Sequence, residues 1–208
     1  MKLKVCGILR KEDLKALAPL APDFFGFVFY PVSKRYVGET IKELMQVPIC
    51  AETKRVGVFV NELSDKVIEI CNRQQLDYAQ LHGNETPDYC NTISKSVNVI
   101  KAFSIDDSFD FKSLKAYDQV CDYFLFDAKG KLPGGNSITY DWNILNRYEL
   151  DKPFFLSGGI RPQHIEQLKT LSHPALFAID INSGFEINPG MKDTKLIREF
   201  FKELKPIA

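Results

Sequence analysis

The chain has 208 residues, of which 45% are hydrophobic and 12% aromatic, enough for one domain with a substantial core. Lysine plus arginine and aspartate plus glutamate each number 27, so the net charge is zero and nothing favours binding to nucleic acid or an anionic membrane. No apolar run reaches the ~18 residues of a membrane span, and the N-terminus enters a strand-like run directly, so we expect neither a membrane segment nor a signal peptide.

The cysteines indicate the cellular compartment. They are odd in number and widely spaced, and none forms a Cys-x-x-Cys pair. Such a pattern is typical of reduced thiols in a cytoplasmic protein. The five are Cys6, Cys50, Cys71, Cys90 and Cys121.

Apolar runs of strand length recur from one end of the chain to the other. Several are continuously apolar rather than alternating, which is typical of strands covered on both faces. We predict strands over residues 3–8, 24–29, 55–60, 78–81, 97–103, 123–127, 153–157 and 176–181. Helical patterns separate several of them, over residues 41–47, 62–75, 86–95, 165–171 and 194–204. Ser64 is the expected N-cap of the second helix, and Asp193 or Thr194 that of the last.

This alternation predicts an α/β fold with a parallel sheet. Eight strands favour closure into a compact, single-domain (β/α)8 barrel over residues 1–208 rather than an open sheet. An open sheet also tends to carry Gly-x-Gly-x-x-Gly after its first strand, and that motif is missing here. Such barrels typically need about 250 residues, so we expect trimmed helices and loops.

Two segments near the end of the chain indicate a phosphate site. The seventh and eighth predicted strands each run into small residues, in Ser157-Gly158-Gly159 and Asn182-Ser183-Gly184. The loops after strands seven and eight form the usual phosphate site of such barrels, and glycine lets backbone N–H groups approach an anion closely. We therefore assign Gly158, Gly159, Ser183 and Gly184 to phosphate binding.

Other polar residues lie at predicted strand ends, which carry the active site of a barrel. Cys6 could be a small buried hydrophobe or a nucleophilic thiol. Asp127 ends an apolar strand, where a partly desolvated carboxyl could act as a general acid or could merely cap a helix. Arg35 could lie on the surface or clamp a substrate carboxylate. His82 and Asp180 are candidate substrate contacts, and three scattered histidines make a metal site unexpected.

In order along the chain, these strand ends resemble one family, the N-(5′-phosphoribosyl)anthranilate isomerases of tryptophan biosynthesis. Each motif alone is weak, but seven in order with compatible spacing are specific and cover essentially the whole chain. They are Lys4-Val5-Cys6-Gly7-Ile8, Gly26-Phe27-Val28-Phe29 with Ser33-Lys34-Arg35-Tyr36-Val37, Gly57-Val58-Phe59-Val60-Asn61, Gln80-Leu81-His82-Gly83, Phe124-Leu125-Phe126-Asp127, Leu156-Ser157-Gly158-Gly159-Ile160, and Asp180-Ile181-Asn182-Ser183-Gly184-Phe185-Glu186.

The resemblance implies an Amadori rearrangement of a phosphoribosyl substrate without metal or organic cofactor. It makes Asp127 the general acid, Cys6 the general base and Arg35 the holder of the anthranilate carboxylate. It implies a monomer or homodimer that acts on a small molecule.

The chain departs from the family pattern at three places. Leu9 stands where threonine is common, Asn136-Ser137 interrupts a glycine-rich run, and Tyr140 replaces phenylalanine before Asp141-Trp142. The long connection over residues 132–142 could be a lid or a plain loop, and Asp141 is the expected N-cap of the following helix.

Several rivals stay open. The phosphoribosyl isomerase of histidine biosynthesis resembles a duplicated half-barrel with an aspartate on its first strand, whereas this chain has Cys6 and no duplication. Indole-3-glycerol-phosphate synthase needs lysines at strand mouths, and a metal-dependent ribulose-phosphate epimerase needs several His and Asp ligands. A non-catalytic barrel that binds a sugar phosphate or a partner protein is a further alternative, which the combination of Cys6, Asp127 and Arg35 disfavours.

Overall fold

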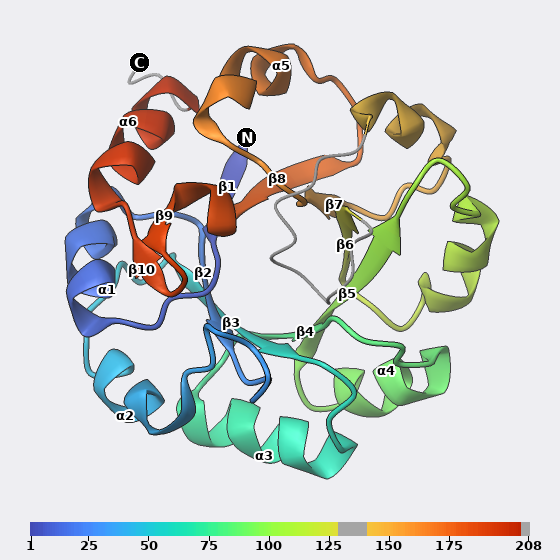
Figure 1. The fold of residues 1–208 in the computed structure, drawn as a ribbon. Helices are drawn as coiled ribbons and strands as arrows, with labels where there is room; N and C mark the ends of the chain where they lie inside the picture. Colours follow the sequence, from blue (N-terminus) through green and yellow to red (C-terminus); the bar gives the residue numbers. More distant parts are fainter. Residues whose placement is uncertain (129–140, 205–208) are drawn as a thin grey trace.

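The structure, a computed structural model, describes residues 1–128 and 141–204. Eight parallel strands pair in chain order, and the first pairs with the last, so the sheet closes into a barrel surrounded by helices (Figure 1). The predicted (β/α)8 fold is confirmed. The strands are β1 (Lys2–Val5), β2 (Phe24–Val28), β3 (Lys54–Phe59), β4 (Tyr78–Leu81), β5 (Asn98–Ile105), β6 (Tyr123–Ala128), β7 (Phe154–Leu156) and β8 (Leu176–Ile181).

The helices are short, as expected for a barrel of this length. Within the described ranges, none of them combines the length and apolar character needed to cross a membrane. The α-helices are α1 (Lys11–Leu17), α2 (Ile41–Leu44), α3 (Ser64–Gln74), α4 (Pro87–Ser94), α5 (Ile165–Thr170) and α6 (Thr194–Leu204). The 3-10 segments are η1 (Ala18–Leu20), η2 (Gly38–Thr40), η3 (Phe111–Tyr117), η4 (Trp142–Arg147), η5 (Pro162–His164) and η6 (Ser183–Phe185).

The N-cap residues of the helices agree with two of the three predictions. Asp193 Oδ1 accepts from the Leu196 N–H at 2.9 Å, so aspartate caps α6. Asp141 Oδ1 likewise accepts from the Asn143 N–H at 3.0 Å at the start of η4. The prediction for Ser64 is wrong, because Ser64 is the first helical residue of α3 and the preceding Leu63 makes no side-chain cap.

Several short elements were not predicted. Helix α1 is only seven residues long and its N-cap, Arg10, makes no side-chain cap, so its sequence signal is weak. The 3-10 segment η3 has a period of three residues rather than 3.6 and escapes a helical pattern search. The hairpin of β9 (Glu186–Asn188) and β10 (Met191–Lys192) is too short to show alternation.

The buried apolar residues of the described ranges form three clusters. The largest lies between the strands and the surrounding helices, a smaller one fills the barrel interior, and the third consists of Cys6, Val28 and Val58. Inside, the Phe155 ring meets Phe24 edge-on with centroids 5.1 Å apart and Tyr123 at 5.5 Å. The interior cluster consists of Phe24, Val56, Ile100, Ala102, Leu125, Phe155 and Ala178. Because alternate residues of each strand face inward, polar residues further along the same faces line the mouth of the barrel.

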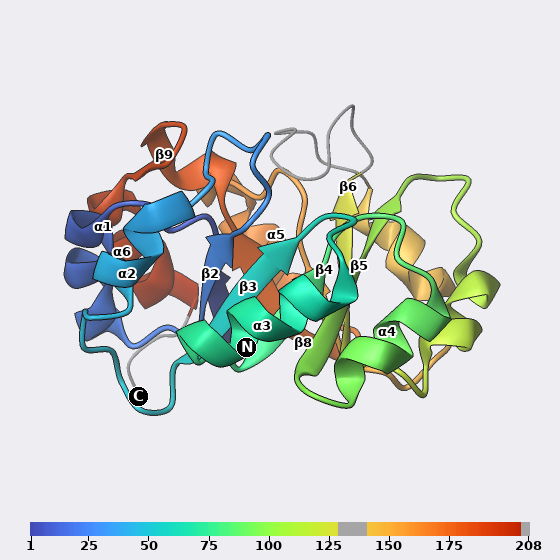
Figure 2. The same cartoon turned by 90° about the horizontal axis from the view of Figure 1, so that it is seen from below.

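The connections at the two ends of the barrel differ. Figure 2 looks across the barrel and shows the β9 hairpin and the loop after β2 at one end, with the N-terminus at the other. The first end carries the C-terminal ends of the strands, where a barrel holds its active site. The predicted lid over residues 132–142 falls mostly on residues 129–140, outside the described part of the chain, as do Asn136, Ser137 and Tyr140.

Candidate active site

One cavity opens at the C-terminal ends of the strands and encloses about 780 Å³, including its open mouth. It is lined by residues at the C-terminal ends of β2, β3, β4, β6 and β8 and by residues that follow β1, β2, β3, β4, β7 and β8. All nine site residues predicted from the sequence line this cavity: Cys6, Arg35, His82, Asp127, Gly158, Gly159, Asp180, Ser183 and Gly184. The fold therefore brings together positions that span most of the chain.

Cys6 directly follows β1 rather than lying within it. Its N–H donates to the Ile181 carbonyl at 2.9 Å, which continues the pairing of β1 with β8 and holds the thiol in the barrel mouth. Burial raises the pKa of the Cys6 thiol above the ordinary 9.0, although the Lys4 and Lys192 cations oppose the shift. In this environment the resting group is the neutral thiol.

Beneath Cys6, Lys4 points into the barrel from the same face of β1. Its Nζ lies 2.9 Å from Oδ2 of Asp180 on β8, and both side chains are almost fully buried. Burial lowers the pKa of Lys4, but Asp180 and Cys6 together more than offset this, so the pKa of Lys4 is raised and it stays charged. Burial in turn raises the pKa of Asp180. The Oδ1 atom of Asp180 is buried and has no hydrogen-bond partner within the described residues, and Asp180 lines the cavity.

Asp127 lies in β6 and contacts the imidazole that follows β4. His82 Nε2 is 3.2 Å from Asp127 Oδ2, and Gln80 Nε2 is 2.9 Å from His82 Nδ1. Because an amide nitrogen only donates, this arrangement assigns the imidazole proton to Nε2, which then donates to Asp127. The histidine therefore orients the carboxyl group that the sequence singled out as an acid.

Arg35 does not present a free guanidinium. Its Nε and Nη2 donate to both carboxylate oxygens of Glu186 at 2.6–3.1 Å, and Lys192 Nζ donates to the same carboxylate at 2.8 Å. Burial would raise the pKa of Glu186, but Arg35 and Lys192 outweigh it and the pKa is lowered. Two of the three guanidinium nitrogens are thus engaged by Glu186, and Arg35 also lines the cavity.

The loops after β7 and β8 pack closely on each other. A side chain at Gly184 would collide with the carbonyl oxygen of Ile160, so the close approach of the two loops requires glycine there. Gly158 has a φ of +96°, which L-residues rarely adopt, and a side chain would also meet the backbone of Ala128. Two loops of small residues that approach so closely can offer N–H groups to one anion.

The described residues offer no clustered set of metal ligands. Among residues 1–128 and 141–204, no three His, Cys, Asp or Glu side chains are grouped so that they could hold a metal ion. All five cysteines lie in these ranges and are free thiols.

A family model for N-(5′-phosphoribosyl)anthranilate (PRA) isomerase matches residues 3–203. The chain belongs to the PRA isomerase family. A relative described as N-(5′-phosphoribosyl)anthranilate isomerase from Parabacteroides distasonis is 41% identical and covers 98% of this chain and 93% of its own. The protein is accordingly an isomerase of tryptophan biosynthesis.

Solved PRA isomerases share the fold closely. The crystal structure of the Thermus thermophilus enzyme superposes with a TM-score of 0.87 at 29% identity and covers 98% of both chains. A second structure, described as a complex with reduced 1-(o-carboxyphenylamino)-1-deoxyribulose 5-phosphate, gives a TM-score of 0.84 at 31% identity over the full length of both chains.

Sequence reasoning gave no role to several polar residues of this PRA isomerase site, notably Lys4, Gln80, Glu186 and Lys192. For Lys4 a signal existed, because a lysine two residues before Cys6 in an otherwise apolar strand must lie on the same face as the thiol. Glu186 and Lys192 follow the eighth strand in a hairpin. No local pattern shows that Glu186 accepts hydrogen bonds from both Lys192 and Arg35.

The buried Lys4–Asp180 pair supports a stability prediction. Lys4→Met leaves the Asp180 carboxylate buried without its partner, so we expect a loss of about 3–5 kcal/mol in the free energy of unfolding. Adding Asp180→Leu to Lys4→Met is expected to recover most of the loss, since no uncompensated charge then remains. Urea unfolding of the variants measures both effects.

The matched control is Lys169→Met, because the Lys169–Glu166 pair is exposed on α5. Lys169→Met is expected to change the free energy of unfolding by no more than about 0.5 kcal/mol. An equally small effect for Lys4→Met would show that the buried pair carries no charge.

Proposed function

We propose that this chain converts N-(5′-phosphoribosyl)anthranilate into 1-(2-carboxyphenylamino)-1-deoxyribulose 5-phosphate, with Asp127 as general acid and Cys6 as general base. One observation carries the proposal: the thiol that follows β1 and the carboxyl in β6 line a single cavity together with an arginine and two glycine loops. The product analogue in the second solved relative has the same chemical groups, namely a carboxylate, an open-chain sugar and a phosphate.

The two charged ends of the substrate fix its orientation in the cavity. Gly158, Gly159, Ser183 and Gly184 would bind the phosphate through the loops after β7 and β8. Arg35 would hold the anthranilate carboxylate with its Nη1 edge, because Glu186 occupies the Nε edge. Remote binding energy of this kind positions the ribose carbons between the acid and the base.

The first step opens the ribose ring. Asp127 in its acid form gives its proton to the ring oxygen while the C1′–O bond breaks, and the nitrogen lone pair forms a C1′=N bond. The His82 Nε2–H then donates to the carboxylate that is left on Asp127, at the 3.2 Å contact already present. Stabilising this carboxylate lowers the cost of the proton transfer.

The second step moves a proton from carbon. The Cys6 thiolate takes the proton from C2′, the C1′=C2′ bond forms, and the electrons of the C1′=N bond return to nitrogen. The resulting enolamine gains a proton at C1′ and loses the proton of its C2′ hydroxyl, which gives the 2′-ketone. These two transfers balance the proton that Cys6 took and the proton that Asp127 gave. These proton transfers rearrange one substrate without net oxidation or reduction, so the reaction as proposed needs no cofactor. His82 and Asp180 would be further contacts to the substrate. We also predict that the protein is cytoplasmic and forms a monomer or a homodimer.

Cys6→Ala and Asp127→Asn are each expected to lower kcat by at least about 100-fold, because each removes one proton-transfer group. The substrate is generated in situ from anthranilate and phosphoribosyl pyrophosphate by the transferase, and the loss of its fluorescence is followed. Matched controls are Cys71→Ala, a buried thiol outside the cavity, and Asp65→Asn, an exposed carboxylate of α3.

Near-normal kcat in either active-site variant contradicts the role of that residue. No fluorescence loss with folded wild-type protein contradicts the proposed reaction, and the aminoaldose of histidine biosynthesis is then the next substrate to assay.

Arg35→Met is expected to raise KM by about 10- to 100-fold, since a hydrogen bond to a charged group is worth about 1.5–3 kcal/mol. The effect should be absent for a substrate analogue built on aniline, which lacks the carboxylate. Steady-state kinetics with both substrates measure the difference, and Arg73→Met on the surface of α3 is the control. Equal losses with both substrates contradict the clamp.

The raised pKa of Cys6 predicts the pH dependence of the reaction. Because the base is the thiolate and the acid is the protonated Asp127 carboxyl, kcat/KM should follow the product of these two fractions. It should not fall until the thiol itself ionises, at a pH above the ordinary thiol pKa. The kcat/KM profile is compared with the ultraviolet thiolate difference between wild type and Cys6→Ala. A profile that falls with pH while the thiol is protonated contradicts the assignment of Cys6 as base.

A further inference from the structure

A further buried ion pair lies outside the cavity, next to the loop that carries His82. Glu85 precedes helix α4 and Lys101 lies in β5, and their side chains are 2% and 3% exposed. Lys101 Nζ is 3.1 Å from Glu85 Oε2. Since Ile100 and Ala102 belong to the interior cluster, Lys101 faces the outside of the barrel wall. Neither charged residue lines the cavity.

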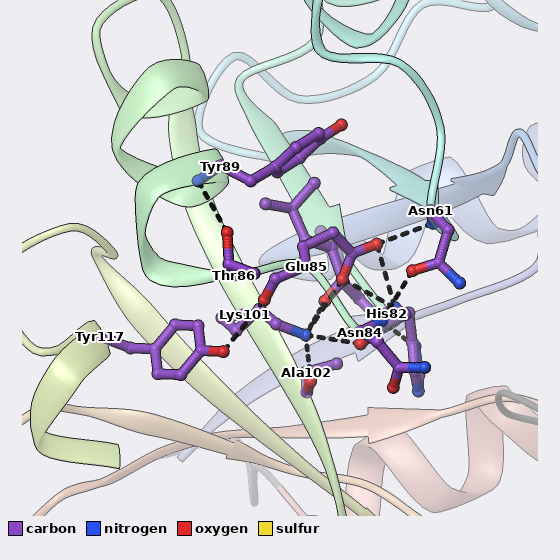
Figure 3. Close-up of polar contacts among 12 residues, drawn as sticks. Asn61, His82, Asn84, Glu85, Thr86, Tyr89, Lys101, Ala102 and Tyr117 are labelled. Carbon is purple, nitrogen blue, oxygen red and sulfur yellow. Dashed lines mark hydrogen bonds and ion pairs between the residues drawn. The ribbon is translucent and has the colours of Figure 1, made fainter. Parts of the chain in front are cut away.

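Lys101 binds the backbone on both sides of His82. Its Nζ donates to the Leu81 carbonyl at 3.1 Å and to the Gly83 carbonyl at 2.9 Å, the residues immediately before and after the histidine (Figure 3). A further bond to the Ala102 carbonyl, at 2.8 Å, ties the ammonium group to its own strand. The ammonium group thus fixes the loop after β4 to β5.

Glu85 binds the peptide group that follows His82. Its two oxygens accept from the Gly83 N–H at 3.1 and 2.9 Å, and Oε1 also accepts from the Asn61 N–H at 2.8 Å. Asn61 Oδ1 in turn accepts from the Asn84 N–H at 2.7 Å, so the loops after β3 and β4 are joined (Figure 3). Three consecutive peptide groups around His82 are therefore held by the two buried charges.

A contribution to stability does not by itself explain this buried ion pair. A buried ion pair is often no more stabilising than well-packed apolar side chains of the same volume. Here three of the five backbone groups that the pair binds flank one cavity residue, His82, whose Nε2 lies 3.2 Å from Asp127. We propose that Glu85 and Lys101 are positioning residues that set the His82 imidazole against the general acid Asp127, and this rests on the function proposed above.

A displaced imidazole changes proton transfer more than substrate binding. Lys101→Met and Glu85→Gln are therefore expected to lower kcat by about 10- to 100-fold with little change in KM. Lys101→Arg keeps the charge and is expected to retain more activity than Lys101→Met. Lys169→Met, which breaks an exposed pair on α5, is the matched control and is expected to leave kcat unchanged.

A double-mutant cycle separates positioning from general loss of stability. In a His82→Asn background, which keeps Asp127 and residual turnover, Lys101→Met and Glu85→Gln are expected to cause almost no further loss of kcat. Equal losses in the two backgrounds, or no loss in wild type, overturn the proposal. If Lys101→Met does not fold, the milder Glu85→Gln decides the outcome.

Nitrogen-15 NMR of the histidine rings gives a readout independent of turnover. The His82 signals are assigned by their absence in His82→Asn, and wild type is expected to show the Nε2-protonated tautomer. Lys101→Met is expected to shift or broaden these signals and to leave those of His164 and His173 unchanged. Unchanged His82 signals overturn the positioning role, whereas absent turnover of wild type with shifted signals contradicts only the proposed reaction.

Discussion

The parallel pairing of β1 with β8 joins the first and last strands of the barrel, and the site depends on its register. That register sets Lys4 opposite Asp180 and continues into the bond from the Cys6 N–H to the Ile181 carbonyl. A one-residue slip would turn the inward-facing side chains outward. The thiol would then leave the cavity, and the Lys4 and Asp180 charges would face the apolar layer under the helices.

Three groups of buried charges surround the cavity, and they serve it in different ways. The Lys4–Asp180 pair lies beneath the thiol, and the Glu186 carboxylate holds Arg35 and Lys192 beside it. The Glu85–Lys101 pair lies behind the barrel wall and acts through the backbone. Because each charge is held by partners of fixed geometry, the cavity presents groups in set directions before a substrate enters, which reduces the reorganisation needed for reaction.

The predicted strands agree with the observed ones to within about three residues at each end, because fully buried strands leave a continuous apolar signal. Cys6, His82, Asp127 and the glycine loops could likewise be located, since each directly follows or ends such a run. Local signals failed for α1 and η3, whose patterns are short or non-α-helical, and for Ser64, where no side-chain cap forms.

The sequence by itself determined the strand order, the closed α/β architecture and which polar side chains reach the barrel mouth, because these follow from periodicity and from strand ends. Its resemblance to one family also indicated the reaction. Only the tertiary structure decided which charges meet: Arg35 with Glu186, Lys4 with Asp180, and Lys101 with the carbonyls on either side of His82. These contacts join residues far apart in the chain or depend on backbone direction, and hydrophobic patterning carries no information on either.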